Sequence, residues 1–189
     1  MRTLAIMVCL VLATSTAFAE SLDMKAKAKW VSEAPVEKIV GSAAGQAKLT
    51  MNGDDLNSIR GTITFKVDTM RSGNTTRDEH LRSAKWLDAE NHNEITFTVE
   101  NVKVNGEKNK QVMTEVIGKM SIHGITQPMT ANAKIKVIKK EDGRKKMRIK
   151  THFVIELGKY EIKGKKGIVG KKVGEKIDVN ATLIGVVQQ

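Results

Sequence analysis

The stretch of sequence that decides the fold is Ile59-Arg60-Gly61-Thr62-Ile63-Thr64-Phe65-Lys66-Val67. Apolar residues and one glycine alternate along it with polar residues. A period of two is typical of a β-strand with one buried face and one solvated face. The stretch therefore predicts a strand whose inner face carries Ile63, Phe65 and Val67.

The same alternation recurs along most of the chain. Further stripes begin at Leu22, Ala47, Ile95, Val112, Ala131, Met147 and Ile177. Turn sequences separate the stripes, among them Asn52-Gly53, Asn105-Gly106, His123-Gly124 and Asp142-Gly143. About eight such strands joined by short turns indicate one all-β domain, either an antiparallel barrel or a sandwich.

One segment interrupts the strands. Residues 74–84 predict a short helix, with Thr76 and Glu79 as a capping box and Asp78 as a negative charge in the first turn. A second turn is expected over residues 85–89. A helix inserted between two barrel strands is expected to cover an end of the barrel.

The first residues resemble a targeting segment. Arg2, the apolar run from Leu4 to Ala13, and Ala17-Phe18-Ala19 match the three parts of a secretory signal peptide. The apolar run is about half of the ~20 residues that span a membrane. We expect residues 1–19 to be a cleaved signal peptide and residues 20–189 to be one periplasmic domain. The only cysteine, Cys9, lies in the segment that is removed, so no thiol chemistry is expected.

The sequence provides no positive evidence for an enzyme. The four histidines, His80, His92, His123 and His152, lack the short spacings of common metal motifs, which favours positions on the rim or surface. No serine nucleophile elbow is present. We therefore predict no catalytic residue, no metal site and no cofactor.

The charge is strongly basic. There are 32 Lys+Arg against 21 Asp+Glu, a net charge of +11, and the basic residues concentrate at positions 134–150 and 163–176. Aromatic residues make up only 4%, too few for a base-stacking surface, so no nucleic-acid partner is expected. Two explanations stay open: a solvated surface that keeps the protein soluble, or peripheral contact with anionic lipid or cell-wall polymer.

Three blocks of sequence resemble the YceI-like family and occur in the family's order. The first runs from Val67 to Asn74 and from Arg77 to Ser83, followed by Trp86-Leu87-Asp88 and Ile95-Thr96-Phe97; the second is Gly118 to Thr130; the third, which is weaker, is Val169 to Val179. The chain departs from the family pattern in two places. Lys29 to Glu37 replaces the usual Asp…His-Ser opening, and His92-Asn93-Glu94 stands where a proline is usual.

The resemblance implies both a fold and a function. The implied fold is an eight-stranded antiparallel lipocalin-like barrel with a short helix between two strands. Members are commonly exported, bind polyisoprenoids, isoprenoid quinones or other amphiphilic lipids along the barrel axis, have no defining catalytic activity, and often form homodimers. We therefore expect a carrier that transports, stores or sequesters a long apolar chain. The alternative is a non-enzymatic envelope stress or structural module with a filled barrel and a basic binding surface.

Alternation and resemblance together predict a ligand site. The expected apolar contacts are Ile63, Phe65, Val67, Ile95, Phe97, Val99, Met120, Ile122, Phe153 and Ile155. Small inward residues such as Gly118, Ala133 and Ala181 would leave room for a chain, whereas large phenylalanines and methionines would fill a solid barrel. Arg77, His80 and Arg82 are candidates to meet a polar headgroup, or alternatively to pin the helix to the barrel.

Overall fold

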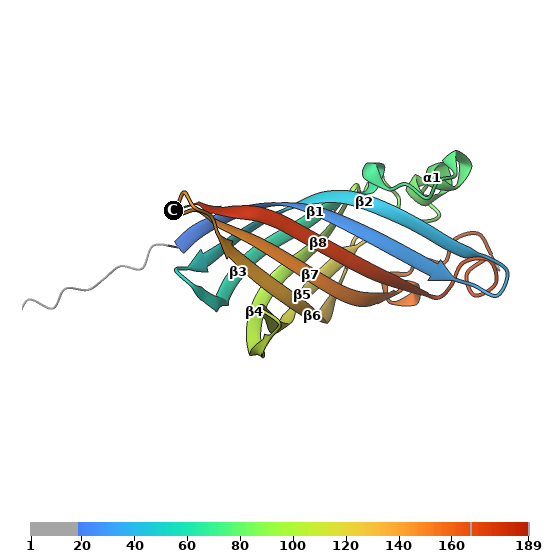
Figure 1. Cartoon of the computed structure of the whole chain (residues 1–189). Helices are drawn as coiled ribbons and strands as arrows, with labels where there is room; N and C mark the ends of the chain where they lie inside the picture. The colour runs from blue at the N-terminus through green and yellow to red at the C-terminus, as the bar shows by residue number, and fades with distance from the viewer. Residues whose placement is uncertain (1–18, 167, 189) are drawn as a thin grey trace, which may run out of the picture.

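The protein is a closed barrel of eight antiparallel strands, seen in a computed structural model that describes residues 19–166 and 168–188. Each strand pairs with its sequence neighbours, and β8 closes the barrel on β1 (Figure 1). The strands are β1 (Ala19–Glu33), β2 (Lys38–Asn52), β3 (Asp55–Lys66), β4 (Glu94–Lys108), β5 (Gln111–Ile122), β6 (Ile125–Lys139), β7 (Lys145–Glu156) and β8 (Lys176–Gln188). The predicted eight-stranded barrel is confirmed.

The predicted signal peptide falls almost entirely outside the described residues. Residues 1–18 are not described, and Ala19 is the first residue of β1. Among the residues that the structure describes, no helix combines the length and apolar character needed to cross a bilayer.

The strands follow the alternation of the sequence but are longer than the stripes suggested. In β1, Met24, Ala26 and Ala28 are buried while Lys25 and Lys27 between them are exposed. β2 begins at Lys38, well before the stripe that starts at Ala47. The early part of β2 also alternates, but its inward residues include glycines and an alanine, which give little hydrophobic signal.

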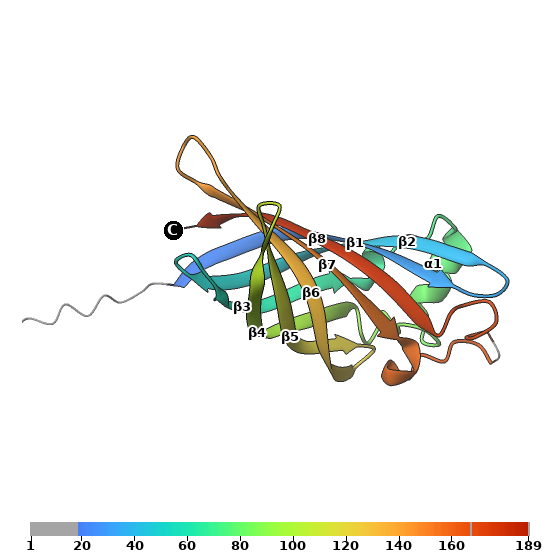
Figure 2. The ribbon, with the colours of Figure 1, turned by 60° about the horizontal axis from the view of Figure 1, so that its bottom comes forward.

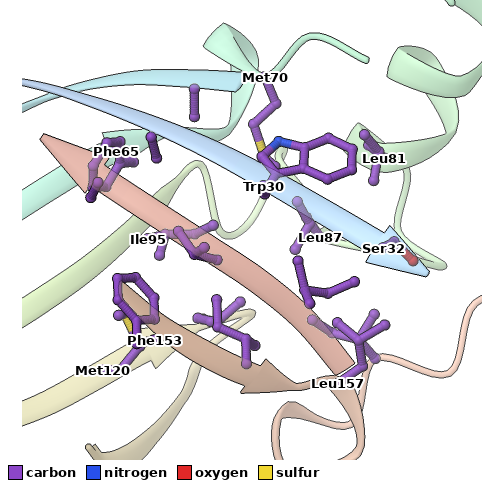
Figure 3. Close-up of a pocket in the computed structure, with 18 of the residues that line it drawn as sticks. Trp30, Ser32, Phe65, Met70, Leu81, Leu87, Ile95, Met120, Phe153 and Leu157 are labelled. Carbon is purple, nitrogen blue, oxygen red and sulfur yellow. The ribbon is translucent and has the colours of Figure 1, made fainter. Parts of the chain in front are cut away.

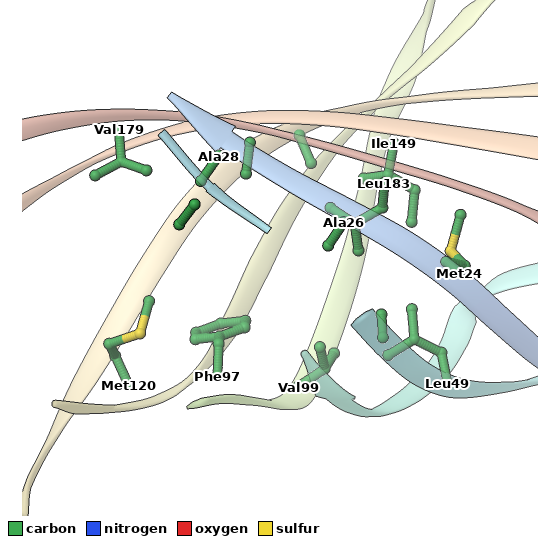
Figure 4. Close-up of a cluster of buried hydrophobic side chains, with 14 of the residues drawn as sticks. Met24, Ala26, Ala28, Leu49, Phe97, Val99, Met120, Ile149, Val179 and Leu183 are labelled. Atoms are coloured by element: carbon green, nitrogen blue, oxygen red, sulfur yellow. The ribbon is translucent and has the colours of Figure 1, made fainter. Parts of the chain in front are cut away.

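The barrel has two different ends. The packed end carries the β2–β3, β4–β5 and β6–β7 hairpins together with the start of β1 and the end of β8 (Figure 2). The open end carries the β1–β2 and β5–β6 connections, helix α1 (Thr75–Arg82) and the β7–β8 loop. Towards the packed end, Leu22, Met24, Met51 and Met147 are 0–3% exposed and belong to the hydrophobic core. Figure 4 shows part of the hydrophobic core, including Met24, Leu49 and Leu183.

Helix α1 forms where the sequence predicts it, but its cap differs. The side chain of Asn74 accepts a hydrogen bond from the Arg77 N–H at 3.0 Å, so Asn74 is the N-cap. The predicted capping box of Thr76 and Glu79 is therefore wrong, because Thr76 already lies inside the helix. Residues 85–89 form turns rather than a helical extension.

Two short 3₁₀ helices, η1 (Val67–Thr69) and η2 (Leu157–Tyr160), lie at the open end. Strand β3 stops at Lys66, and the Val67 N–H donates to the Asn93 carbonyl oxygen at 2.9 Å. After η1 the chain is tied to β2 through reciprocal backbone hydrogen bonds between Ser42 and Arg71. These bonds hold the α1 segment over the mouth of the barrel.

Candidate binding site in the barrel lumen

A cavity of about 910 Å³ occupies the barrel (Figure 3). Its volume is at the upper end of the range of about 300–1,000 Å³ that is usual for small-molecule sites. All eight strands contribute inward residues to its wall, and most of these residues are apolar. Of the two alternatives left open by the sequence, the structure shows the hollow barrel.

A band of small residues creates this space. The strand registers place Ala43 beside Ala28, Ala28 beside Ala181, Ala181 beside Thr151, and Thr151 beside Ala133. These residues lie on five successive strands around the barrel, and all of them line the cavity. Since their side chains are short, the lumen stays open across the middle of the barrel.

Nine of the ten predicted apolar contacts line this cavity. They are Ile63, Phe65, Ile95, Phe97, Val99, Met120, Ile122, Phe153 and Ile155. Val67 does not line the cavity, because β3 ends one residue earlier and Val67 is buried in η1. Whether the nine contact a ligand stays a prediction.

The mouth of the cavity is built by segments that the strand pattern did not reveal. Leu81 of α1 and Trp86 and Leu87 after it form one side, and Ile168 and Val173 of the β7–β8 loop also line the cavity. The two segments meet where Gly164 packs against the Trp86 ring: a Cβ at this position would lie 2.6 Å from Trp86 Cζ2. Sequence alternation could not find these residues because they lie outside strands.

The basic residues at the mouth divide into two groups. Arg77 donates to Glu37 Oε1 at 2.6 Å and to Ser72 Oγ at 3.1 Å, and Arg82 donates to the Met70 carbonyl oxygen at 3.3 Å. Both arginines therefore hold the α1 segment in place, and Arg82 does not line the cavity.

The second group consists of exposed residues that line the cavity. It comprises His80, a predicted headgroup residue, together with Lys85, Lys165 and Lys172. Within the described residues, none of these three lysines forms an ion pair with a carboxylate. The mouth therefore presents cations that are free to meet an anionic or strongly polar group.

Trp30 supplies an unusual polar feature inside the lumen. Its ring lies over Gly41 of the neighbouring strand, where a Cβ would be only 2.1 Å from Trp30 Cζ2. The side chain is buried, and its indole N–H has no hydrogen-bond partner among the described residues. An unpaired buried donor is costly, and a ligand oxygen placed beside it would remove that cost. By contrast, the buried Ser32 hydroxyl already accepts from the Gly174 N–H at 2.9 Å.

Tyr160 and three of the histidines do not line the cavity itself. Burial raises the pKa of the Tyr160 phenol. The rings of His92 and His123 meet edge to face with centroids 5.5 Å apart, while His152 pairs with Asp178 at 3.2 Å. In residues 19–166 and 168–188, no group of three or more His, Cys, Asp or Glu is arranged to hold a metal ion. The chemistry that the lumen offers is burial of apolar surface beside a small polar mouth.

Comparison with known proteins identifies relatives of the sequence. The model of the YceI-like domain family matches residues 19–184. Protein YceI of Escherichia coli O6:H1 is 32% identical over 73 residues, which cover 39% of this chain and 36% of that protein. A UPF0312 protein of Serratia proteamaculans is 33% identical over 73 residues, covering 39% of this chain and 35% of the relative. The matched stretch thus spans little more than a third of the length of these relatives.

Solved structures share the fold at low sequence identity. Burkholderia cenocepacia BcnA superposes with a TM-score of 0.70 at 15% identity, covering 85% of this chain and 96% of BcnA. A polyisoprenoid-binding domain from Saccharophagus degradans, implicated in plant cell wall breakdown, superposes with a TM-score of 0.68 at 11% identity, covering 90% and 99%. These similarities establish the shared barrel architecture.

Proposed function

This chain belongs to the YceI-like family, and from that premise we propose that it is a non-enzymatic protein that holds a long apolar chain in its barrel. The ligand class is a polyisoprenoid, an isoprenoid quinone or a similar amphiphilic lipid. The observation that carries the proposal is the apolar lumen of about 910 Å³ with a polar mouth. The polyisoprenoid-binding domain with the same fold supports this choice of ligand class.

The energetics of the lumen favour affinity over selectivity. Burying roughly 500 Å² of ligand surface at ~25 cal/mol per Å² gives about 12 kcal/mol before ordering costs. Ordering of the ligand removes a large share of this, and the remainder still supports useful binding. Because apolar burial has no direction, chains of similar width should bind about equally well.

Polar groups at the mouth are proposed to set the orientation of the ligand. The Trp30 N–H would meet an acceptor oxygen, while His80, Lys85, Lys165 and Lys172 would surround the head of the ligand. Arg77 and Arg82 are assigned to positioning α1 instead, since both are held by hydrogen bonds within the protein. The ligand would therefore enter with its chain first.

The cellular setting is also part of the proposal. Residues 1–19 are proposed to direct export to the periplasm, where the protein would transport, store or sequester its lipid. Pairing into a homodimer is proposed from the family resemblance and is measurable by light scattering. The second candidate, an envelope module with a filled barrel, is disfavoured by the open lumen.

Native mass spectrometry and organic extraction test the proposal. Protein purified from cells should carry an extractable apolar molecule, and after extraction it should rebind ubiquinone with quenching of its two tryptophans, Trp30 and Trp86. Ala181→Phe fills the middle of the lumen and should abolish rebinding. Thr182→Val, on the outer face of the same strand, is the matched control and should rebind normally. Wild-type protein with neither extractable lipid nor ubiquinone binding would contradict the proposal.

A further inference from the structure

A basic face covers one outer wall of the barrel. It is formed by outward residues of β6, β7 and β1, which β8 brings together from distant parts of the sequence. We define the basic face by these residues: Lys25, Lys27, Lys29, Lys134, Lys136, Lys146, Arg148 and Lys150. The lysines of β1 lie more than 100 positions before those of β6, so only closure of the barrel creates the face.

The strand register sets like charges against each other on this face. Lys134 lies directly opposite Lys150, and Lys136 lies directly opposite Arg148. Like charges in directly opposite positions destabilise a sheet. These two pairs are therefore unfavourable for the isolated protein, and an anionic surface placed over them would relieve the repulsion.

Few carboxylates lie close enough to neutralise the basic face. Among the described residues, none of its eight members forms an ion pair with a carboxylate. Strand β8 crosses its centre with the uncharged outward residues Asn180, Thr182 and Ile184. Carboxylates lie at its margins: Asp23 opposite Val186, Asp178, which pairs with His152, and Glu115 opposite Asn132 of β6.

Apolar side chains lie among these cations. Ile184 is 40% exposed and sits between Arg148 on one side and Lys25 on the other. Ile138, also 40% exposed, lies opposite Lys146 where the β6–β7 hairpin projects beyond the barrel (Figure 2). Cations interleaved with exposed isoleucines match a lipid surface, which offers both anionic headgroups and apolar chains.

We propose that the basic face docks the protein onto a bilayer that contains anionic lipid. The cations supply attraction of about 1 kcal/mol each near such a surface, which corresponds to about fivefold in affinity per charge. Ile184 and Ile138 add a smaller apolar term. Because the face lies on the outer wall, this docking does not depend on whether the lumen holds a ligand.

Vesicle co-sedimentation with the mature protein tests the proposal. The protein should bind phosphatidylglycerol-containing vesicles at low salt, bind pure phosphatidylcholine vesicles far less, and lose binding as salt rises. The variant Lys134→Gln/Arg148→Gln/Lys150→Gln should bind these vesicles about 100-fold more weakly, because each of the three lost charges reduces affinity about fivefold. Its melting temperature should stay the same or rise, since like-charge repulsion is removed.

A matched control keeps the net charge equal. Lys103→Gln/Lys108→Gln/Lys110→Gln removes three exposed cations outside the basic face and should bind vesicles within a few fold of wild type. Equal losses in the two triple variants would overturn the proposal, because they would show attraction by net charge alone. Ile184→Thr should weaken vesicle binding a few fold without weakening binding to heparin. Binding of the wild-type protein to heparin but not to phosphatidylglycerol-containing vesicles would overturn the proposal in favour of a polymer partner.

Discussion

The packed end and the open half of the barrel are built from the same strands and differ in what fills them. Leu22, Met24 and Met147 at the packed end are 0–3% exposed, whereas Ile63 and Phe153 line the lumen and stay half-buried. Both sets point inward. The difference shows that the open half leaves part of some inward side chains exposed to the cavity, although others there, such as Ile122 at 2% exposed, are fully covered by their neighbours.

Packing explains the contrast. At the packed end, Gly185 lies between Met24 and Met147 in the strand register, and a Cβ there would be 2.7 Å from Met24 Cγ. Flexible methionines fill irregular space well, so this end closes. In the open half, the alanines of the small-residue band leave the facing walls apart.

The largest expected effect comes from truncating the packed end. Met147→Ala should cost about 2–5 kcal/mol of unfolding free energy, because it leaves a cavity in a filled region. Ile155→Ala in the lumen should cost only a fraction of this, since its side chain already faces open space. Urea denaturation of the lipid-free proteins measures both. Equal losses would contradict the difference between the two ends.

The second largest effect is expected from replacing an alanine by leucine, which should destabilise the packed end but not the lumen. Ala26→Leu inserts carbons into the filled region and should cost about 1–3 kcal/mol through overpacking. Ala28→Leu, two residues along the same strand, points into the cavity and should leave stability nearly unchanged while abolishing ubiquinone binding. Thermal unfolding and fluorescence titration report the two effects. A large loss of stability in Ala28→Leu would show that the lumen is less open than described.

A smaller effect concerns the anchoring of the open end. Hydrogen bonds from the Ser72 hydroxyl at 2.6 Å and backbone N–H at 2.7 Å lower the pKa of the buried Asp78 carboxyl from its ordinary 3.8. The carboxylate therefore stabilises the fold above that pH, and this contribution is lost as the pH falls towards the folded-state pKa. Asp78→Asn should cost about 1–3 kcal/mol at neutral pH.

Denaturation over a range of pH checks this prediction. The difference between wild type and Asp78→Asn should shrink as the pH falls below about 4, because the wild-type carboxyl then takes up its proton. A difference that stays constant down to acid pH would assign the loss to packing and not to the charge. The packed end, which Asp78 does not touch, should keep its hydrogen-exchange protection in both proteins.

The smallest effect is expected from Arg77→Gln. The Arg77–Glu37 ion pair is partly exposed, and such pairs contribute about 0.2–1 kcal/mol. Hydrogen exchange should quicken in α1 and in the β1–β2 connection, with the packed end unchanged. Faster exchange throughout the barrel would show that the mouth and the core unfold as one unit.

Much of the fold could be predicted because the alternation of apolar and polar residues along each strand shows which side chains face inward. Phe65 and Phe97, which stand between polar neighbours, point into the lumen as the alternation predicts, and so does Phe153 although Val154 follows it. The prediction that Val67 faces the lumen was wrong because nothing in its local sequence pattern marks the change from β3 to η1. The Asn74 cap was missed because Thr76 and Glu79 also satisfy the spacing of a capping box.

The mouth was harder to predict because it depends on tertiary contacts. Trp86 and Ile168 are far apart in sequence and line one cavity only after the barrel has closed. The same limit applies to the volume of the lumen. Alanines at 28, 43, 133 and 181 leave an open space only because the strand registers bring them into one band.

Closure of the barrel through β1 and β8 has a practical consequence for handling the molecule. Ser21 pairs with Gln188, so the beginning and the end of the described chain lie together, on the side away from α1 (Figure 1). A tag, fusion partner or surface linker joined beside Ser21 or Gln188 would lie at the end of the barrel away from the mouth of the cavity. Immobilisation at this end would leave the mouth of the cavity accessible to vesicles or micelles.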